Sequence, residues 1–417
     1  MNNKLEHLNP ISKVKSNSSV KFLTNAAYPG NHCPMHTALA LGSKIKGLST
    51  LLIGTAECST YARMVISSSE GDNGELHWMY LMDSHEVVFG CKKGLIDAIE
   101  QMDKENVPAI LVIVTCVPEV IGEDIEGIIN EIQPRIKARL TFVLMGHFKC
   151  NSHPQGSWKT LLALGSLMEE KIKSQKSINI FGRSPDDDHS PMPKFLKVIM
   201  DNGYNLRFLA PDASLNDFFE ATDATLNIVL SPLTQPLAEY MEKEFATPYL
   251  SVYNAYSIND IDDIYEKISN ALGIDFSNEI LSEREAALIL ENEAKEIYDG
   301  KRFTCGAIGA QLVIPLATYL TILGMEPVII HVEEIYPDDK KHIKALCDLG
   351  FDPIACHMVG GIYDVKILET MGIDICFGIF QGVQPQFACV SDMYELYGAI
   401  GYDRTKLLLE KIKETLK

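Results

Sequence analysis

The feature of the sequence that most restricts the fold is an apolar, β-branched run followed by a stretch with helical spacing and a second apolar run. Residues 108–115 (PAILVIVT) have the composition of a strand that is covered on both faces. After a turn at 116–118, residues 119–136 have the spacing of a helix, and residues 140–145 form the next apolar run. Strand, helix and strand in this order predict a βαβ unit with a parallel sheet.

The same order of elements occurs twice more along the chain. The strands and helices predicted for these later units are residues 177–181, 193–202, 206–209, 302–305, 311–323 and 327–331. We therefore expect an α/β fold of three Rossmann-like domains, each a mainly parallel sheet flanked by helices.

Two charged segments, both predicted to be helical, mark the domain boundaries. They are residues 171–176 and residues 282–299, and Gly300 closes the second one. The predicted domains are an N-terminal α/β domain that carries the candidate ligand cysteines, a middle α/β domain and a C-terminal α/β domain, at residues 1–174, 175–299 and 300–417.

The charge balance and the cysteine content restrict the partners and the compartment. Lys and Arg number 37 and Asp and Glu 56, so the formal net charge is −19, which argues against nucleic acid or an anionic membrane as a partner. The N-terminal segment has no apolar core of the signal-peptide type, and ten cysteines then indicate a reducing compartment. We expect a cytoplasmic protein in which cysteines act as thiolates or metal ligands.

One uncharged stretch, residues 304–325, is long enough to span a bilayer. Its glycines and Pro315 favour a buried strand, loop and helix, so we expect no membrane segment. The chain has no phosphate-binding loop, because residues 156–160 (GSWKT) have the wrong spacing, and no G-x-G-x-x-G opens a helix. ATP hydrolysis by this chain and a dinucleotide cofactor are therefore not expected.

Three cysteines, Cys33, Cys58 and Cys116, have similar local settings. Cys58 and Cys116 follow predicted strands, and Cys33 lies in a loop rich in Pro and Gly, residues 28–35. Since ligands of open α/β sheets bind beyond the carboxyl ends of strands, these thiols could meet at one soft metal centre. The simpler alternative is that each is a small buried core residue, and their spacing matches no compact ligand motif. Three ligands are one short of the usual four, which points to completion by a second chain.

The flanks of these cysteines carry a resemblance to a known family. Residues 115–128 (TCVPEVIGEDIEGI) are the most specific match, residues 51–63 and 85–99 support it, and residues 227–249 and 372–402 are similar more weakly. With these flanks the chain resembles the α and β subunits of the nitrogenase molybdenum–iron protein superfamily. That superfamily includes cofactor-scaffold relatives and dark-operative protochlorophyllide reductase.

The resemblance implies three Rossmann-like domains and an iron–sulfur cluster at a subunit interface, with Cys33, Cys58 and Cys116 as its ligands. The cluster would be a [4Fe-4S] cluster or a P-cluster-like [8Fe-7S] cluster. A separate ATP-dependent iron protein would supply the electrons. The chain would form a homodimer, or a heterodimer or heterotetramer with a homologous subunit.

Two departures from the family pattern concern the iron–molybdenum cofactor, which nitrogenase holds in addition to the iron–sulfur cluster. Nitrogenase α subunits hold the iron–molybdenum cofactor with a cysteine where this chain has Ser231, and a hydroxyl is a poor ligand for iron. The nearest match to the histidine that completes that attachment is Cys389. The molybdenum cofactor is therefore not expected in its usual site. A different metallocofactor held partly by Cys389 is one alternative, and a buried structural Cys389 is the favoured one.

The other cysteines are weaker candidates. Cys150 and His153 could be two soft ligands, although a polar loop pair is the simpler interpretation, and Cys356 and His357 would point apart in an extended segment. Core positions are predicted for Cys91, Cys305, Cys347 and Cys376.

Two functions remain open at this point. The chain would be a subunit of a nitrogenase-like oxidoreductase that passes low-potential electrons through its cluster to a small molecule or a tetrapyrrole. Alternatively, it would be a scaffold on which a nitrogenase-type metallocofactor is assembled. A redox-silent relative is disfavoured, because all of Cys33, Cys58 and Cys116 are retained.

Overall fold

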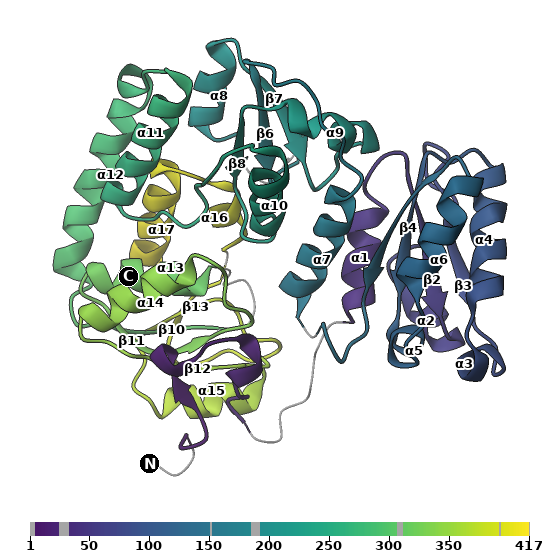
Figure 1. The fold of residues 1–417 in the computed structure, drawn as a ribbon. Helices are drawn as coiled ribbons and strands as arrows, with labels where there is room; N and C mark the ends of the chain where they lie inside the picture. Colours follow the sequence, from purple (N-terminus) through teal and green to yellow (C-terminus); the bar gives the residue numbers. More distant parts are fainter. Residues whose placement is uncertain are drawn as a thin grey trace. The chain divides into compact units, whose positions relative to one another are not determined.

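The computed structural model describes residues 5–24, 33–150, 152–184, 192–306, 312–391 and 393–416 (Figure 1). The described strands form one six-stranded and two four-stranded sheets. By their internal contacts the residues group into two units. We call residues 31–186 with 204–251 the first unit, and residues 1–30 with 187–203 and 252–417 the second unit.

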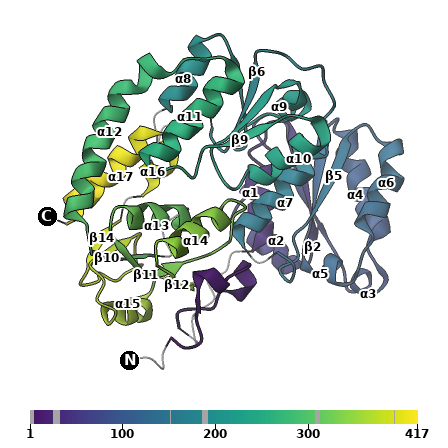
Figure 2. The same cartoon turned by 60° about the vertical axis from the view of Figure 1, so that its left-hand side comes forward.

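The first sheet has the strand order β3-β2-β4-β5, and all its strands are parallel. Every residue of the two central strands is buried, as expected of a sheet covered on both faces. Helices α1 and α7 cover one face, and α4 and α6 cover the other (Figures 1 and 2). The bounds are β2 (Leu48–Gly54), β3 (His77–Leu81), β4 (Ala109–Val114), β5 (Arg139–Leu144), α1 (Pro34–Gly42), α4 (Lys92–Lys104), α6 (Ile125–Ile132) and α7 (His153–Gly165).

The predicted turn at 116–118 and helix at 119–136 were wrong in detail. A short helix, α5 (Cys116–Val120), begins directly at the cysteine, and α6 follows as a separate element. Gly122 between them has a φ of 77°, a left-handed conformation that ends α5 and that glycine adopts without strain. Asp124 then caps α6, because its carboxylate accepts a hydrogen bond from the Gly127 amide at 3.0 Å.

The second sheet has the order β7-β6-β8-β9, again all parallel. Its central strands carry a buried amide pair, in which Asn179 Nδ2 donates to Asn227 Oδ1 at 2.8 Å. Helix α10 packs on α7 of the first sheet, where a Cβ at Gly165 would lie 2.9 Å from Leu237 Cδ1. The bounds are β6 (Ser177–Phe181), β7 (Asn205–Leu209), β8 (Leu226–Val229), β9 (Tyr249–Ser251), α9 (Leu215–Glu220) and α10 (Gln235–Phe245).

The charged segment 171–176, predicted to be helical, has no helix. The Lys171 amide donates to Thr222 Oγ1 at 3.0 Å, and Lys173 Nζ donates to the Ala224 carbonyl at 3.1 Å. Lys171 Nζ also lies 3.0 Å from carboxylate oxygens of both Glu169 and Glu220. These bonds to distant residues hold the segment as an extended connection, and they replace the local hydrogen bonds of a helix.

The third sheet lies in the second unit and has the order β1-β12-β11-β10-β13-β14. Strand β1 pairs antiparallel with β12, and the other pairs are parallel. Strand β1, near the N-terminus, thus belongs to a sheet whose other strands all lie in the predicted C-terminal domain, residues 300–417. The domain boundaries near 174 and 299 stay a prediction. The strand bounds are β1 (Asn9–Pro10), β10 (Arg302–Cys305), β11 (Glu326–His331), β12 (Ile354–Cys356), β13 (Ile375–Phe377) and β14 (Ala388–Val390).

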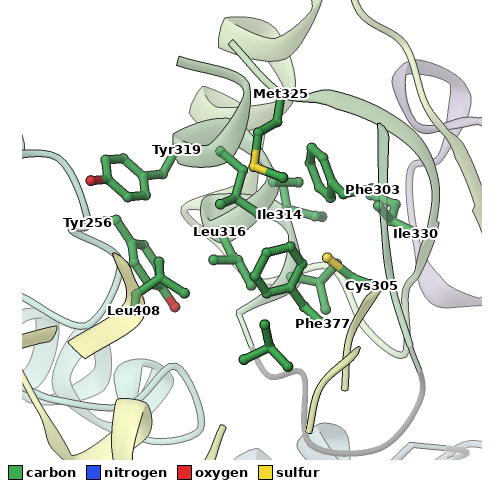
Figure 3. Packing of buried hydrophobic residues seen from close by; sticks show 14 of the residues in the cluster. Tyr256, Phe303, Cys305, Ile314, Leu316, Tyr319, Met325, Ile330, Phe377 and Leu408 are labelled. Carbon is green, nitrogen blue, oxygen red and sulfur yellow. The ribbon is translucent and has the colours of Figure 1, made fainter. Parts of the chain in front are cut away.

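The core of the second unit explains the uncharged stretch at 304–325. Figure 3 shows aromatic and aliphatic side chains that pack together there, among them Phe303, Phe377, Tyr256 and Tyr319. The rings of Tyr256 and Tyr319 stack with centroids 5.9 Å apart. None of the described helices is long and apolar enough to cross a membrane. The helices of this unit are α8 (Lys194–Asp201), α11 (Ile258–Leu272), α12 (Ser277–Ile297), α13 (Val313–Ile322), α14 (Asp339–Asp348), α15 (Ile362–Glu369), α16 (Tyr394–Gly398) and α17 (Tyr402–Thr415).

The prediction of an α/β fold of parallel sheets flanked by helices is confirmed. The predicted acidic helix at 282–299 is also present as the larger part of α12, which begins earlier, at Ser277, and ends at Ile297.

Candidate metal centre

Two of the three candidate cysteines follow neighbouring strands of the first sheet. Cys58 lies in α2 (Ala56–Ala62), which follows β2, and Cys116 begins α5, which follows β4. Strands β2 and β4 are parallel and paired in register up to Ile53 and Val114, so their carboxyl ends meet at one sheet edge. Cys33 precedes α1, which packs against α2, and the loop residues 25–32 before it lie outside the described part.

Cys33 lies close enough to Cys58 and Cys116 to be influenced by both. Burial raises the pKa of the Cys33 thiol, amide hydrogen bonds from Met35 and His36 oppose this, and the charges of Cys116 and Cys58 raise it further. All three side chains are partly exposed.

A glycine keeps the space beside Cys58 open. A Cβ at Gly54 would lie 2.3 Å from Thr115 Oγ1 and 3.1 Å from Cys58 Sγ. Thr115 in turn donates its hydroxyl hydrogen to the Ile53 carbonyl at 2.8 Å, which ties the ends of β2 and β4 together. The strand ends can therefore hold Cys58 and Cys116 at this edge only with a glycine at position 54.

The loop after β5 lies against Cys116. The His147 amide donates a hydrogen bond to Cys116 Sγ at 3.3 Å. The buried carboxylate of Glu119 accepts from the Gly146 amide at 2.6 Å and pairs with Lys149 Nζ at 3.3 Å. Glu119 thus holds the loop that places an N–H group on the sulfur, and such N–H groups tune the potential of iron–sulfur clusters.

The candidate ligands are three thiols, which are the usual ligands of iron–sulfur clusters. Among the residues that the structure describes, no three His, Cys, Asp or Glu side chains converge as the ligands of one metal ion would. In an iron–sulfur cluster each thiolate binds a different iron, so the ligands surround a larger body. Cys33, Cys58 and Cys116, grouped at one edge and partly exposed, fit that requirement.

Large apolar side chains surround this edge and are exposed. They follow the carboxyl ends of all four strands of the first sheet, on or directly after α2 and α5, on α3 (Glu86–Phe89) and on the loop after β5. In Figure 1 these three helices gather at the lower end of the sheet. We call this surface the apolar rim, and its members are Tyr61, Met64, Val88, Phe89, Val120, Ile121 and Phe148. Most are more than half exposed, with 79% for Phe148 and 76% for Met64.

Cys389, the candidate ligand for a second cofactor, lies on β14 in the second unit. It is partly buried, and it is paired in register with the fully buried Cys376 on β13. No pattern in the sequence indicated this pairing. Ser231 follows β8 in the first unit, where a Cβ at Gly182 would lie 2.5 Å from its Cβ.

The remaining cysteines are mostly in the core. Cys150 is fully buried, whereas His153 is an exposed first residue of α7, and Cys356 is buried at the end of β12. The predicted core positions of Cys91, Cys305 and Cys376 are confirmed. The prediction for Cys347 was wrong, because it lies on the exposed face of α14.

A cavity that the sequence did not reveal lies between β2, β3 and α2. Its volume is about 310 Å³, and its polar lining includes Arg63, Thr50 and His77. Thr50 Oγ1 and His77 Nδ1 are hydrogen-bonded at 3.0 Å, and burial lowers the pKa of His77. The two polar residues Ser49 and Thr50 at the start of an otherwise apolar strand were the available signal.

Comparisons with known proteins show which proteins this chain is similar to in sequence and in fold. One subunit of the light-independent protochlorophyllide reductase of Picosynechococcus sp. is 27% identical over 188 residues, which cover 41% of this chain and 37% of that protein. The same subunit from Nostoc punctiforme is 25% identical over 188 residues, with the same coverage of 41% and 37%. The match thus spans well under half the length of these curated relatives.

A solved structure described as nitrogenase Cp1 at pH 6.5 has the same fold, with a TM-score of 0.71 at 17% identity over 94% of this chain and 93% of that one. A family model described as nitrogenase component 1 type oxidoreductase matches residues 33–417, which is nearly the whole chain. The chain therefore belongs to the nitrogenase component 1 type oxidoreductase family.

Proposed function

We propose that the chain is a subunit of a nitrogenase-like reductase and that Cys33, Cys58 and Cys116 hold an iron–sulfur cluster in it. The observation that carries the proposal is the placement of three partly exposed thiols, with Cys58 and Cys116 after the paired strands β2 and β4 and Cys33 at the start of α1. When bound, the cluster would accept electrons of low potential and release them one at a time. The substrate would be a small molecule or a tetrapyrrole, and the names of the curated relatives support the second.

The residues around the thiols suit this task. The His147 amide would donate to the sulfur of Cys116 in the cluster-bound state as well, and Glu119 would keep that loop in place. Hydrogen bonds to ligand sulfur make a cluster easier to reduce, because they stabilise added negative charge. Gly54 leaves room for the Cys58 side chain beside Thr115.

A second chain would complete the site. Three thiolates leave the usual set of four ligands one short, and all three are partly exposed. The apolar rim surrounds them, and an exposed apolar patch of this kind is typical of an interface. We infer that a second copy of the chain or a homologous subunit covers the rim and supplies the remaining ligand or ligands.

The electrons would come from a separate ATP-dependent iron protein. The chain itself has no phosphate-binding loop, since the GSWKT segment forms part of α7. ATP hydrolysis would therefore occur on the partner and reach this chain only as electrons.

Turnover under strictly anaerobic conditions tests the function. The cluster-loaded protein would be mixed with an iron protein, ATP and dithionite, and candidate tetrapyrroles would be followed by their absorption spectra. Reduction that needs both ATP and the iron protein would support the proposal, and the Cys116→Ala variant should abolish it. A protein that binds a cluster, turns over no candidate substrate and instead releases a metallocofactor to an acceptor would point to the scaffold alternative.

A further inference from the structure

We propose that Cys376 and Cys389 form a reactive dithiol in the second unit, which a small disulfide oxidises reversibly to an intrachain disulfide. The two residues lie on the neighbouring parallel strands β13 and β14 and are paired in register. Neighbouring strands lie about 4.8 Å apart, and in-register residues point to the same face. That spacing is within the range of roughly 4.4–6.8 Å between the Cα atoms of disulfide-bonded cysteines.

The two thiols have different roles because they differ in access. Cys376 is 0% exposed, whereas Cys389 is partly exposed. Cys389 is therefore the thiol that reagents reach first, and Cys376 is the one that resolves the product.

The reaction is a two-step thiol–disulfide exchange. The Cys389 thiolate attacks one sulfur of the small disulfide, the S–S bond breaks, and one thiolate leaves, so that a mixed disulfide forms at Cys389. Cys376 then attacks the Cys389 sulfur, the mixed disulfide breaks, and the second small thiol leaves with the Cys376 proton. In total, two protein thiols are oxidised by two electrons and one small disulfide is reduced to two thiols.

The other cysteines of this sheet are not placed to take part. Cys305 on β10 is in register with Phe377, so its side chain lies on the opposite face of the sheet from Cys376. Cys356 shares an apolar cluster with Cys376, but β11 and β10 lie between β12 and β13. The geometry thus selects one pair.

An oxidised pair would protect Cys389 and fix the position of its strand. Strand β14 is the last strand in the sheet order, and the disulfide would link it covalently to β13. A disulfide is also reversible, whereas an isolated reactive thiol can proceed to sulfinic and sulfonic acids.

The sequence allows a direct test on the full chain. Trypsin cleaves after Lys366 and Arg404, no Lys or Arg lies between them, and the peptide 367–404 contains Cys376 and Cys389 and no other cysteine. The protein would be treated anaerobically with 2-hydroxyethyl disulfide, alkylated with iodoacetamide and digested. We expect this peptide to lose two hydrogen atoms and to carry no alkyl group. Cleavage by chymotrypsin between the cysteines should then give two peptides joined by a disulfide, and dithiothreitol should restore both thiols.

Variants and an internal control separate the pair from isolated thiols. Exposed Cys347 should keep a mercaptoethanol adduct, which shows that the reagent was active. In Cys376→Ser the adduct should persist at Cys389, and in Cys389→Ser the buried Cys376 should stay reduced. The wild-type peptide decides the matter even where a variant fails to fold. Two alkylated thiols in it, or a lasting adduct at Cys389, while Cys347 has reacted completely would overturn the proposal.

Discussion

The backbone amide of His147 donates a hydrogen bond to Sγ of Cys116 at 3.3 Å. His147 belongs to the loop after β5, and a carboxylate holds that loop in place. That carboxylate belongs to Glu119, which is only three residues after Cys116 and accepts from the Gly146 amide. The helix α5 that begins with the candidate ligand thus also carries the group that positions an N–H donor on its sulfur.

The first prediction concerns Glu119. Replacing it with Ala leaves the buried Gly146 amide without its acceptor, so the free energy of unfolding should fall by about 1–3 kcal/mol. Glu119→Gln keeps an acceptor oxygen and should lose less. Urea unfolding of the three proteins measures the difference, and equal midpoints would show that Glu119 does not hold the loop.

The second prediction concerns Gly54. Gly54→Ala places a methyl group against Thr115 Oγ1 and Cys58 Sγ, so the strand end must shift, at a cost of about 1–3 kcal/mol, and iron binding should weaken. Gly361→Ala is the matched control, because a Cβ at Gly361 meets no atom within 4 Å. Iron content and unfolding midpoint would be measured on both. An iron content in Gly54→Ala equal to that of the control would contradict the close packing at this edge.

The third prediction concerns the apolar rim. Phe89 is 74% exposed, and Phe89→Asp places a charge within the proposed contact, so the iron-loaded protein should dissociate at higher concentrations than the wild type. Ile172→Asp is the control, since Ile172 is 94% exposed and lies outside the rim. Sedimentation velocity over a concentration series measures both. If the two variants assemble alike, the rim is not the interface.

The fourth prediction concerns pH and His331. Burial, with a smaller contribution from His357, lowers the pKa of His331 to about 3, and its Nδ1 accepts from the Met358 amide at 2.9 Å. Between pH 6.5 and 3 the unfolded chain binds the proton and the folded chain does not, so the stability present above pH 6.5 falls as the pH falls.

A variant isolates the contribution of His331. His331→Asn keeps an acceptor and cannot titrate, so wild type should lose about 2 kcal/mol more than the variant between pH 6.5 and pH 5. Urea unfolding at the two pH values measures this. A parallel loss in both proteins would mean that His331 is free to ionise in the folded chain.

The sequence was informative where local pattern decides structure. The β-branched run at 108–115 corresponds to β4, and the run at 177–181 coincides with β6, because a strand buried on both faces needs apolar side chains at successive positions. Cys58 and Cys116 could also be predicted to lie at one edge, because each follows a predicted strand and parallel strands end at the same edge of a sheet.

The features that the sequence did not predict depend mainly on contacts between residues far apart in the chain. The register that sets Cys376 beside Cys389 depends on how β13 and β14 align, and no residue pattern within either strand indicates it. The segment 171–176 has the composition of a helix, but its hydrogen bonds go to residues about fifty positions away. A core position was predicted for Cys347 because the sequence indicates a helix there, but it does not show that Cys347 lies on the exposed face of that helix.

The central claim is that Cys33, Cys58 and Cys116 bind iron together, and iron and acid-labile sulfide per chain test it most directly. The wild type and the variants Cys33→Ala, Cys58→Ala, Cys116→Ala and Cys91→Ala would be purified anaerobically and analysed side by side. Iron and sulfide should fall in the first three variants and stay at the wild-type level in Cys91→Ala, whose side chain is buried in the apolar core. Equal iron in all four variants would contradict the account.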